Sequence, residues 1–213
     1  MDAMTADFVE RTRAHYREKF ALHGATPQGV DWNGEDSQLA HFAQLAKLLP
    51  TDGRAFSVND WGCGYGALAG YLRERFPGVR YTGIDLNEAM IEAAREASAG
   101  ADGISFVVAD RPLQPADHGL ASGVFTLRLG RSDADCAADL ERSIGILAET
   151  SRVGFAFNCL TSYSDPPKMR EHLYYADPLV LFDLCKRRHA KDVALLHDYG
   201  LYAFTILVRK ELG

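Results

Sequence analysis

A carboxylate followed by three alternating glycines is the part of the sequence best suited to binding a ligand. Asp60, Gly62, Gly64 and Gly66 stand between a short apolar run and a segment with helical spacing. Glycine permits the tight turn that such a junction needs, and it lets the backbone approach a ligand closely. The free N–H groups at the start of the following helix point toward the same place. The segment therefore predicts a turn that binds a nucleoside cofactor.

Asp60 helps to decide which nucleoside cofactor this turn would accept. Gly62, Gly64 and Ala67 satisfy the dinucleotide fingerprint, but that match alone is weak evidence. A carboxylate beside a pyrophosphate would be repelled, whereas a carboxylate beside an ammonium group would be attracted. Asp60 therefore favours a nucleoside that carries a cationic head and no phosphate.

Two further carboxylates follow apolar runs later in the chain. Asp85 ends the segment Gly83-Ile84-Asp85, and Asp110 closes the segment Phe106-Val107-Val108-Ala109-Asp110. A carboxylate at the end of the second strand can accept hydrogen bonds from both ribose hydroxyls. At the end of the third strand it can accept one from an adenine amino group. Capping of the next helix or turn is the structural alternative for both residues.

The elements that must position these carboxylates alternate between strand and helix from residue 55 onward. Such alternation predicts a parallel sheet with helices on both faces, and a closing pair of strands around Tyr199-Gly200 predicts an antiparallel hairpin. Before residue 55 we expect a helix over 6–22, a loop over 24–36 and a helix over 37–49. The expected strands are 55–60, 80–85, 104–108, 122–129, 152–158, 193–197 and 203–208, and the expected later helices are 67–76, 87–98, 133–150 and 178–188.

The three acidic segments, taken in order, resemble the cofactor motifs of class I S-adenosylmethionine-dependent methyltransferases of the small-molecule type. The resemblance covers residues 55–210. It implies an α/β, Rossmann-like, doubly wound and mostly parallel seven-stranded sheet, with a C-terminal antiparallel hairpin and N-terminal lid helices. It divides the chain into a lid over 1–50 and a cofactor-binding domain over 51–213. The implied cofactor-binding residues are Asp60, Gly62, Cys63, Gly64, Asp85, Leu86, Met90, Asp110, Arg111 and Ser122.

The implied reaction is methylation of a small molecule, such as a metabolite, a sugar or a natural-product intermediate, with S-adenosylhomocysteine as the second product. Its acceptor should lie beyond the carboxyl ends of the fourth and fifth strands. The catalytic candidates are Tyr16 on the lid, Arg128 for an acidic substrate, Asn158 at a strand end and Tyr163 in an aromatic loop. No Asn-Pro-Pro-Tyr or Pro-Cys segment occurs there, which argues against the base methylases that use them.

Composition narrows the partners and the location. The chain has 213 residues and a net charge of −6, and an acidic average disfavours a nucleic-acid substrate. No apolar run is long enough to span a bilayer, and the first residues lack the apolar stretch of a signal peptide, so we expect a cytoplasmic protein. None of the four cysteines has metal-ligand spacing, so we expect no metal. A homodimer stays open.

Three other functions remain open at this stage. The same fold can direct a nucleophile within S-adenosylmethionine against its own carbons, which would make the protein a cyclase or lyase. An NAD(P)-dependent oxidoreductase would use a similar glycine turn, although Asp60 and Asp110 argue against it. A cofactor-binding partner without turnover is the third alternative.

Overall fold

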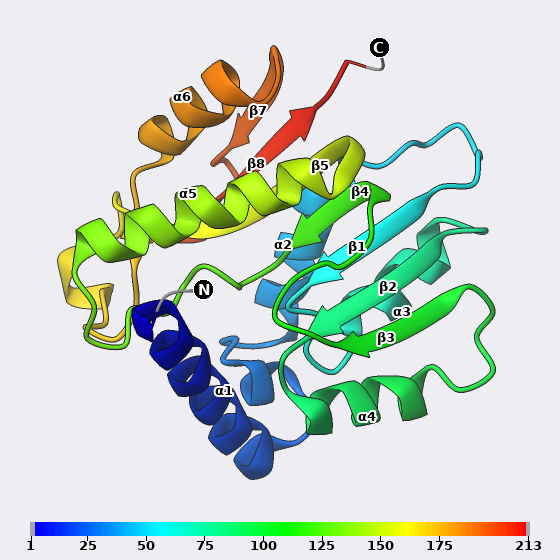
Figure 1. Ribbon diagram of the computed structural model, residues 1–213, viewed down its shortest axis with the longest axis horizontal. Coiled ribbons are helices and arrows are strands. Elements are labelled where there is room, and N and C mark those ends of the chain that lie inside the picture. Colours follow the sequence, from blue (N-terminus) through cyan, green and yellow to red (C-terminus); the bar gives the residue numbers. More distant parts are fainter. Residues whose placement is uncertain (1–2, 212–213) are drawn as a thin grey trace.

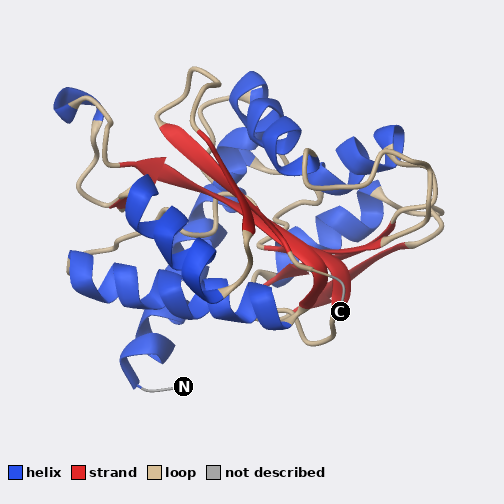
Figure 2. Cartoon of the chain, turned by 90° about the horizontal axis from the view of Figure 1, so that it is seen from above, coloured by secondary structure: helices blue, strands red, loops and turns tan. Residues whose placement is uncertain are grey.

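The computed structural model describes residues 3–211, which form a single twisted sheet covered by helices on both faces (Figures 1 and 2). The helices are α1 (Ala3–His23), η1 (Pro27–Val30), α2 (Glu35–Ala46), α3 (Ala67–Arg75), α4 (Glu88–Ala97), α5 (Asp133–Glu149), η2 (Pro166–Lys168) and α6 (Pro178–Arg188). The strands are β1 (Ser57–Trp61), β2 (Arg80–Asp85), β3 (Ile104–Val108), β4 (Ala116–Ala121), β5 (Ser151–Thr161), β6 (Tyr175–Ala176), β7 (Asp192–Leu196) and β8 (Ala203–Arg209).

The sheet has the order β3-β2-β1-β4-β5-β8-β7, with β6 pairing β5 off this path. Strands β1 to β5 are parallel, and β8 runs antiparallel to both β5 and β7. The predicted Rossmann-like sheet and its closing hairpin are therefore confirmed. The order reverses between β1 and β4, and ligands of such sheets bind at the carboxyl ends of the strands beside this switch point.

Two apolar clusters hold the layers together. One packs α2, α3 and α4 against one face through residues such as Leu45, Leu72 and Ile91. The other packs α5 and α6 against the opposite face through residues such as Ile144 and Leu181. Figure 1 shows α5 in front of β4 and β5, with α2 and α3 behind the sheet. Helix α1 belongs to neither layer and stands beside the ends of the strands (Figure 1).

Side-chain caps explain where several helices begin. Asn87 accepts from the N–H groups of Ala89 and Met90 at the start of α4, and Asp177 caps α6 ahead of Pro178. A cap of this type satisfies N–H groups that the helix itself cannot bond. Because Asn87 supplies the cap of α4, the carboxylate of Asp85 remains available for other partners.

The expected strand over 122–129 is wrong, because the fourth strand lies earlier, at Ala116–Ala121. Its residues have little intrinsic strand preference, but burial between β1 and β5 imposes the extended conformation. The apolar residues that suggested a strand belong to a loop: Val124 and Phe125 pack on the core under α5, and Leu127 makes a single bridge to Leu173.

No helix within residues 3–211 is both long and apolar enough to cross a membrane. Within the same residues, no three His, Cys, Asp or Glu side chains are grouped so that they could hold a metal ion. All four cysteines are buried and unpaired.

Candidate active site

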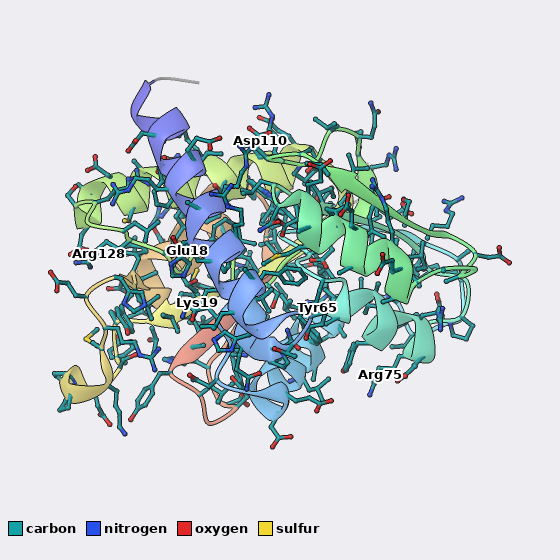
Figure 3. The ribbon with its side chains drawn as sticks, turned by 90° about the horizontal axis from the view of Figure 1, so that it is seen from below. Glu18, Lys19, Tyr65, Arg75, Asp110 and Arg128 are labelled. Carbon is teal, nitrogen blue, oxygen red and sulfur yellow. The ribbon has the colours of Figure 1, made fainter. Side chains whose placement is uncertain are left out.

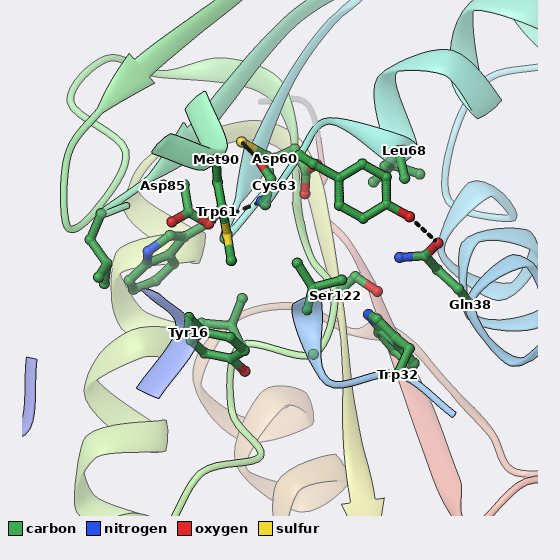
Figure 4. A pocket seen from close by; sticks show the side chains of 18 of the residues that line it. Tyr16, Trp32, Gln38, Asp60, Trp61, Cys63, Leu68, Asp85, Met90 and Ser122 are labelled. Carbon is green, nitrogen blue, oxygen red and sulfur yellow. Dashed lines mark hydrogen bonds between the residues drawn. The ribbon is translucent and has the colours of Figure 1, made fainter. Parts of the chain in front are cut away.

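A cavity lies at the carboxyl ends of β1 and β2, where the turn from residue 62 to residue 66 leads into α3 (Figure 4). Helix α1, the loop from residue 30 to residue 32, helix α2 and the segment after β4 complete its wall. Many of the residues predicted to bind the cofactor line it, namely Asp60, Gly62, Cys63, Gly64, Asp85, Leu86, Met90 and Ser122. The structure thus brings together residues that span more than sixty positions of the sequence.

Asp60 is the most unusual group in this cavity. Its side chain is 1% exposed, its Oδ2 accepts a hydrogen bond from the Tyr81 hydroxyl, and its Oδ1 has no partner among the described residues. Burial raises the pKa of Asp60 to about 7, the bond from Tyr81 opposes the shift, and the charge of Asp85 adds to it. A buried carboxylate oxygen without a donor is costly, so a cationic or hydrogen-bonding ligand would stabilise it.

Asp85 is held by the backbone of the glycine turn. Its Oδ2 accepts from the N–H of Gly64 at 3.0 Å, and its Oδ1 accepts from the N–H of Asn87 at 2.9 Å. Burial raises the pKa of this carboxyl as well, while these backbone bonds lower it. Each carboxylate oxygen can accept more than one hydrogen bond, so the fixed side chain can still receive a pair of hydroxyls.

The glycines of the turn leave room that a larger residue would remove. Gly62 has φ +74°, and a Cβ there would lie 2.5 Å from Val124 Cγ2; Gly64 has φ +54°, and its Cβ would lie 2.9 Å from Val30 Cγ1. Other residues rarely adopt such a φ. The turn therefore needs glycine both for its backbone conformation and for its close approach to the opposite wall.

Several cavity residues carry no motif and were not predicted from the sequence. Trp61 lines the cavity, and its Nε1 donates to the carbonyl of Asp110 at 2.9 Å. Gln38 accepts from the Tyr65 hydroxyl at 2.9 Å, so a side chain of α2 is tied to the glycine turn (Figure 4). Trp32 forms part of the same wall. Their only sequence signal is an aromatic or amide residue in a segment predicted to face the cofactor.

The structure places the side chains of Asp110 and Arg111 away from this cavity. Both residues are exposed, and neither lines the wall. The reason is that β3 ends at Val108 and the chain then turns outward, so only the Asp110 carbonyl faces inward, toward Trp61. Figure 3 shows Asp110 at the surface. The expected contact from an Asp110 carboxylate to adenine has no support in this arrangement.

A second cavity, of about 440 Å³, lies beside the first and shares Tyr16, Val30, Trp32 and Gly123 with it. Tyr16 is the only catalytic candidate that faces both cavities. Burial raises its pKa, a contribution from the Asp31 charge adds to this, and a hydrogen bond with Thr126 opposes it. Its hydroxyl is therefore protonated at neutral pH and suits positioning better than proton abstraction.

The remaining three catalytic candidates lie in different surroundings. Asn158 lines the second cavity, where its Oδ1 accepts from the N–H of Gly123 at 2.8 Å and its Nδ2 donates to Ser122 Oγ at 3.1 Å. Arg128 lines neither cavity; it is paired with Asp133, and it follows a loop rather than the expected strand. Tyr163 is 62% exposed and packs on His197. Figure 3 shows Arg128 and Asp110 on opposite sides of α1.

Helix α1 is held beside the first cavity by contacts with the segment after β2 and with the end of η1. Arg13 Nε donates to the Leu86 carbonyl at 3.2 Å. The Asp31 carboxylate lies 3.2 Å from His15 Nε2 and 2.8 Å from Lys19 Nζ. Asp31 has φ 63°, in the left-handed region, where it ends η1. These contacts fix Tyr16, on the same helix, against the cavities.

Comparison with known proteins gives consistent matches. The family model for a methyltransferase domain matches residues 58–142. A protein of Mycobacterium tuberculosis (strain ATCC 25618 / H37Rv) that is named as a methyltransferase is 56% identical over 155 residues, which cover 73% of this chain and 93% of that protein. Trans-aconitate 2-methyltransferase of Paracidovorax citrulli is 36% identical over 93 residues, which cover 41% of this chain and 35% of that enzyme.

Solved structures share the fold at low sequence identity. Magnesium protoporphyrin IX methyltransferase from Synechocystis, with bound S-adenosylhomocysteine, superposes with a TM-score of 0.66 at 14% identity, covering 93% of this chain and 99% of that one. The N-methyltransferase NodS from Bradyrhizobium japonicum, also with S-adenosylhomocysteine, superposes with a TM-score of 0.65 at 16% identity. The match covers 93% of this chain and 98% of that one.

Proposed function

Because this chain belongs to the class I S-adenosylmethionine-dependent methyltransferases, we propose that it methylates a small molecule bound beside the glycine turn. One observation carries the proposal: buried Asp60 lines the first cavity, and its Oδ1 has no hydrogen-bond partner among the described residues. An ammonium group there would satisfy that oxygen and favour its ionised form. A pyrophosphate there would meet a carboxylate instead of donors, which argues against a nicotinamide cofactor.

The residues of the first cavity fit the parts of the donor one by one. Asp60 would hold the ammonium of the methionine part, and Asp85 would accept hydrogen bonds from the ribose hydroxyls. Leu86 and Met90 would pack against the adenine. Bound S-adenosylmethionine supplies an electrophilic methyl group, whose bond to sulfur breaks with the electron pair left on the sulfur.

The acceptor would occupy the second cavity, which adjoins the first through Tyr16, Trp32 and Gly123. Tyr16 and Asn158 are then positioning candidates, whereas Arg128 and Tyr163 lie outside both cavities. Helix α1 and η1 would act as a lid over both sites and exclude water from the reacting groups. A cavity of about 440 Å³ is of a size that suits a small molecule.

The test is incubation of the protein with methyl-labelled S-adenosylmethionine and a fractionated metabolite extract, followed by mass spectrometry of labelled products. We expect label in one small molecule together with S-adenosylhomocysteine. Methylthioadenosine as the only product would identify a cyclase or lyase instead. Binding without turnover in any fraction would identify a non-catalytic partner, and failure to bind the cofactor would overturn the proposal.

A further inference from the structure

His41 is a buried histidine that the cofactor site does not use. It lies on α2, is 5% exposed, and lines the second cavity. Its Nδ1 is 2.7 Å from the carbonyl oxygen of Ser37. A carbonyl oxygen can only accept, so Nδ1 must carry the proton, and in the neutral ring Nε2 is then a free acceptor. Nε2 has no hydrogen-bond partner among residues 3–211.

The ring of His41 is fixed between two aromatic side chains. Trp32 lies 4.5 Å away between ring centroids, and Tyr199, from the loop before β8, lies 5.7 Å away. Trp32 also lines the first cavity, so the histidine stands next to the wall that separates the two cavities. Burial lowers the pKa of His41, and the bond to Ser37 opposes this, so the ring is neutral at physiological pH.

The charged groups around the second cavity are unbalanced. Lys168, at the end of η2, and Arg170, in the segment after it, line this cavity, and neither forms an ion pair with a residue in the described part of the chain. Asp31 is the lining carboxylate, and it is already paired with His15 and Lys19. Burial raises the pKa of Tyr199 to about 12, so that neighbour of His41 is uncharged. In a protein with a net charge of −6, this cavity is therefore lined by two exposed positive side chains that have no ion-pair partner among the described residues.

We propose that the acceptor is a hydroxyl compound that also carries a carboxylate or phosphate group. His41 Nε2 would accept the hydroxyl proton, and Lys168 and Arg170 would hold the anionic group. This inference rests on the proposed methyl transfer and specifies its acceptor. A guanidinium and an ammonium both suit such oxyanions, and the neutral imidazole supplies the acceptor that a hydroxyl nucleophile needs.

The proposed step balances with the groups named. The hydroxyl gives its proton to His41 Nε2, its oxygen forms a bond to the methyl carbon, and the carbon–sulfur bond breaks with its electron pair left on sulfur. The imidazolium then returns the proton to solvent, so no oxidant or reductant is needed.

The first experiment reads the histidine itself, without turnover. The protein is labelled with ¹⁵N-histidine and saturated with S-adenosylhomocysteine. NMR spectra that correlate the ring nitrogens with the carbon-bound ring protons then give the tautomer of His41. We expect the Nδ1–H form at pH 7 and a titration below the ordinary histidine range. An Nε2–H form or an imidazolium at pH 7 would overturn the role of His41. The variant His41→Asn identifies the signal and keeps a donor for Ser37, and His23→Asn, on an exposed histidine, is the control.

The second experiment reads the anion site with a matched pair of probes, glycerol 3-phosphate and glycerol. In the same labelled protein we expect saturable shifts of the His41 signals with glycerol 3-phosphate and at least ~10-fold weaker binding of glycerol. The double variant Lys168→Ala/Arg170→Ala should lose that preference. The variant Lys186→Ala/Arg187→Ala, at the exposed end of α6, should keep it.

Equal binding of the two probes, or an unchanged preference in the Lys168→Ala/Arg170→Ala variant, would overturn the anion site.

Once an acceptor is found in the extract assay, kcat at saturating cofactor should fall as pH drops through the His41 titration. His41→Asn should lower kcat by ~100-fold and abolish this fall of kcat at low pH, while S-adenosylhomocysteine still binds. If the unmodified protein did not bind S-adenosylhomocysteine, that result would instead contradict the proposed function. Failure of the acceptor inference and failure of the proposed function are therefore distinguishable.

Discussion

Two residues of the cofactor cavity are carboxylates whose burial disfavours the ionised form. Asp60 and Asp85 both have raised pKa values, because both lie in a cavity with little access to water. Such groups are costly to the folded protein alone. A donor with an ammonium and a pair of hydroxyls recovers that cost, which explains why a stable fold retains two carboxylates so close together.

Cofactor affinity should depend on pH through Asp60. Its pKa of about 7 lies above its value in an unfolded chain, so the free protein loses stability as pH rises toward 7. The ammonium binds the ionised form, so affinity should rise ~10-fold per pH unit up to about pH 7 and then level off. Calorimetric titration with S-adenosylhomocysteine from pH 5.5 to 8 measures this. Asp60→Asn should bind more weakly with a flat profile, and a retained slope in that variant would exclude Asp60 as the titrating group.

Asp85→Ala should weaken cofactor binding by ~2–3 kcal/mol, because charge-assisted hydrogen bonds to the ribose are lost. The same substitution also frees the N–H groups of Gly64 and Asn87, so Asp85→Asn, which keeps an acceptor in place, is the second variant. Asp102→Ala, in an exposed turn, serves as the control. If both Asp85 variants bound the cofactor with wild-type affinity, Asp85 would not be the residue that binds the ribose.

Among the elements, α1 lines both cavities through Tyr16, and we propose that it acts as their lid. Its last turns are attached to η1 by the contacts of His15 and Lys19 with Asp31, and Tyr16 lies between those two residues in the sequence. The hydrogen bond from His15 and the contacts with Lys19 hold the pKa of Asp31 below its ordinary range, although burial opposes them. The stability that Asp31 contributes is therefore complete at neutral pH and is lost only in acid.

Asp31→Asn should loosen α1 without straining the chain, because asparagine also tolerates the left-handed backbone at φ 63°. We expect amide exchange in residues 10–23 to quicken about fivefold, corresponding to roughly 1 kcal/mol for partly exposed ion pairs. The cofactor should also dissociate faster. Asp7→Asn removes an exposed contact with Arg11 on the same helix and should change neither rate. Unchanged exchange in Asp31→Asn would show that α1 is held by other contacts.

The sequence allowed most elements and much of the cofactor cavity to be predicted, for physical reasons. Strand–helix alternation and the glycine turn are local patterns, so β1, α3, β2 and α4 were found close to their observed bounds. The fourth strand was misplaced because its extended form comes from its neighbours β1 and β5, while the apolar loop after it imitates a strand.

The acceptor side was predicted less well, because it is assembled from distant segments. His41 comes from α2, Trp32 from the loop after η1, and Lys168 and Arg170 from the segment after β5, and no spacing connects them. Arg128 and Asp110 were selected as residues at strand ends, but the backbone turns away before each of them.

At the scale of the whole molecule, ligand binding should stabilise the fold selectively. S-adenosylhomocysteine at ~100 times its Kd adds about 2.7 kcal/mol, which corresponds to a Tm increase of roughly 5–10 °C for a domain of this size. NADH at the same concentration should leave Tm unchanged, because its pyrophosphate would face Asp60. Differential scanning fluorimetry of the two ligands measures this, and comparable stabilisation by NADH would favour an oxidoreductase.

A crystal structure of the protein with S-adenosylhomocysteine tests the proposed cofactor site most directly. We expect the ligand ammonium within hydrogen-bond distance of Asp60 Oδ1, with both ribose hydroxyls on Asp85 and the adenine against Leu86 and Met90. An ammonium placed elsewhere, with Asp60 Oδ1 still without a partner in a saturated crystal, would contradict it.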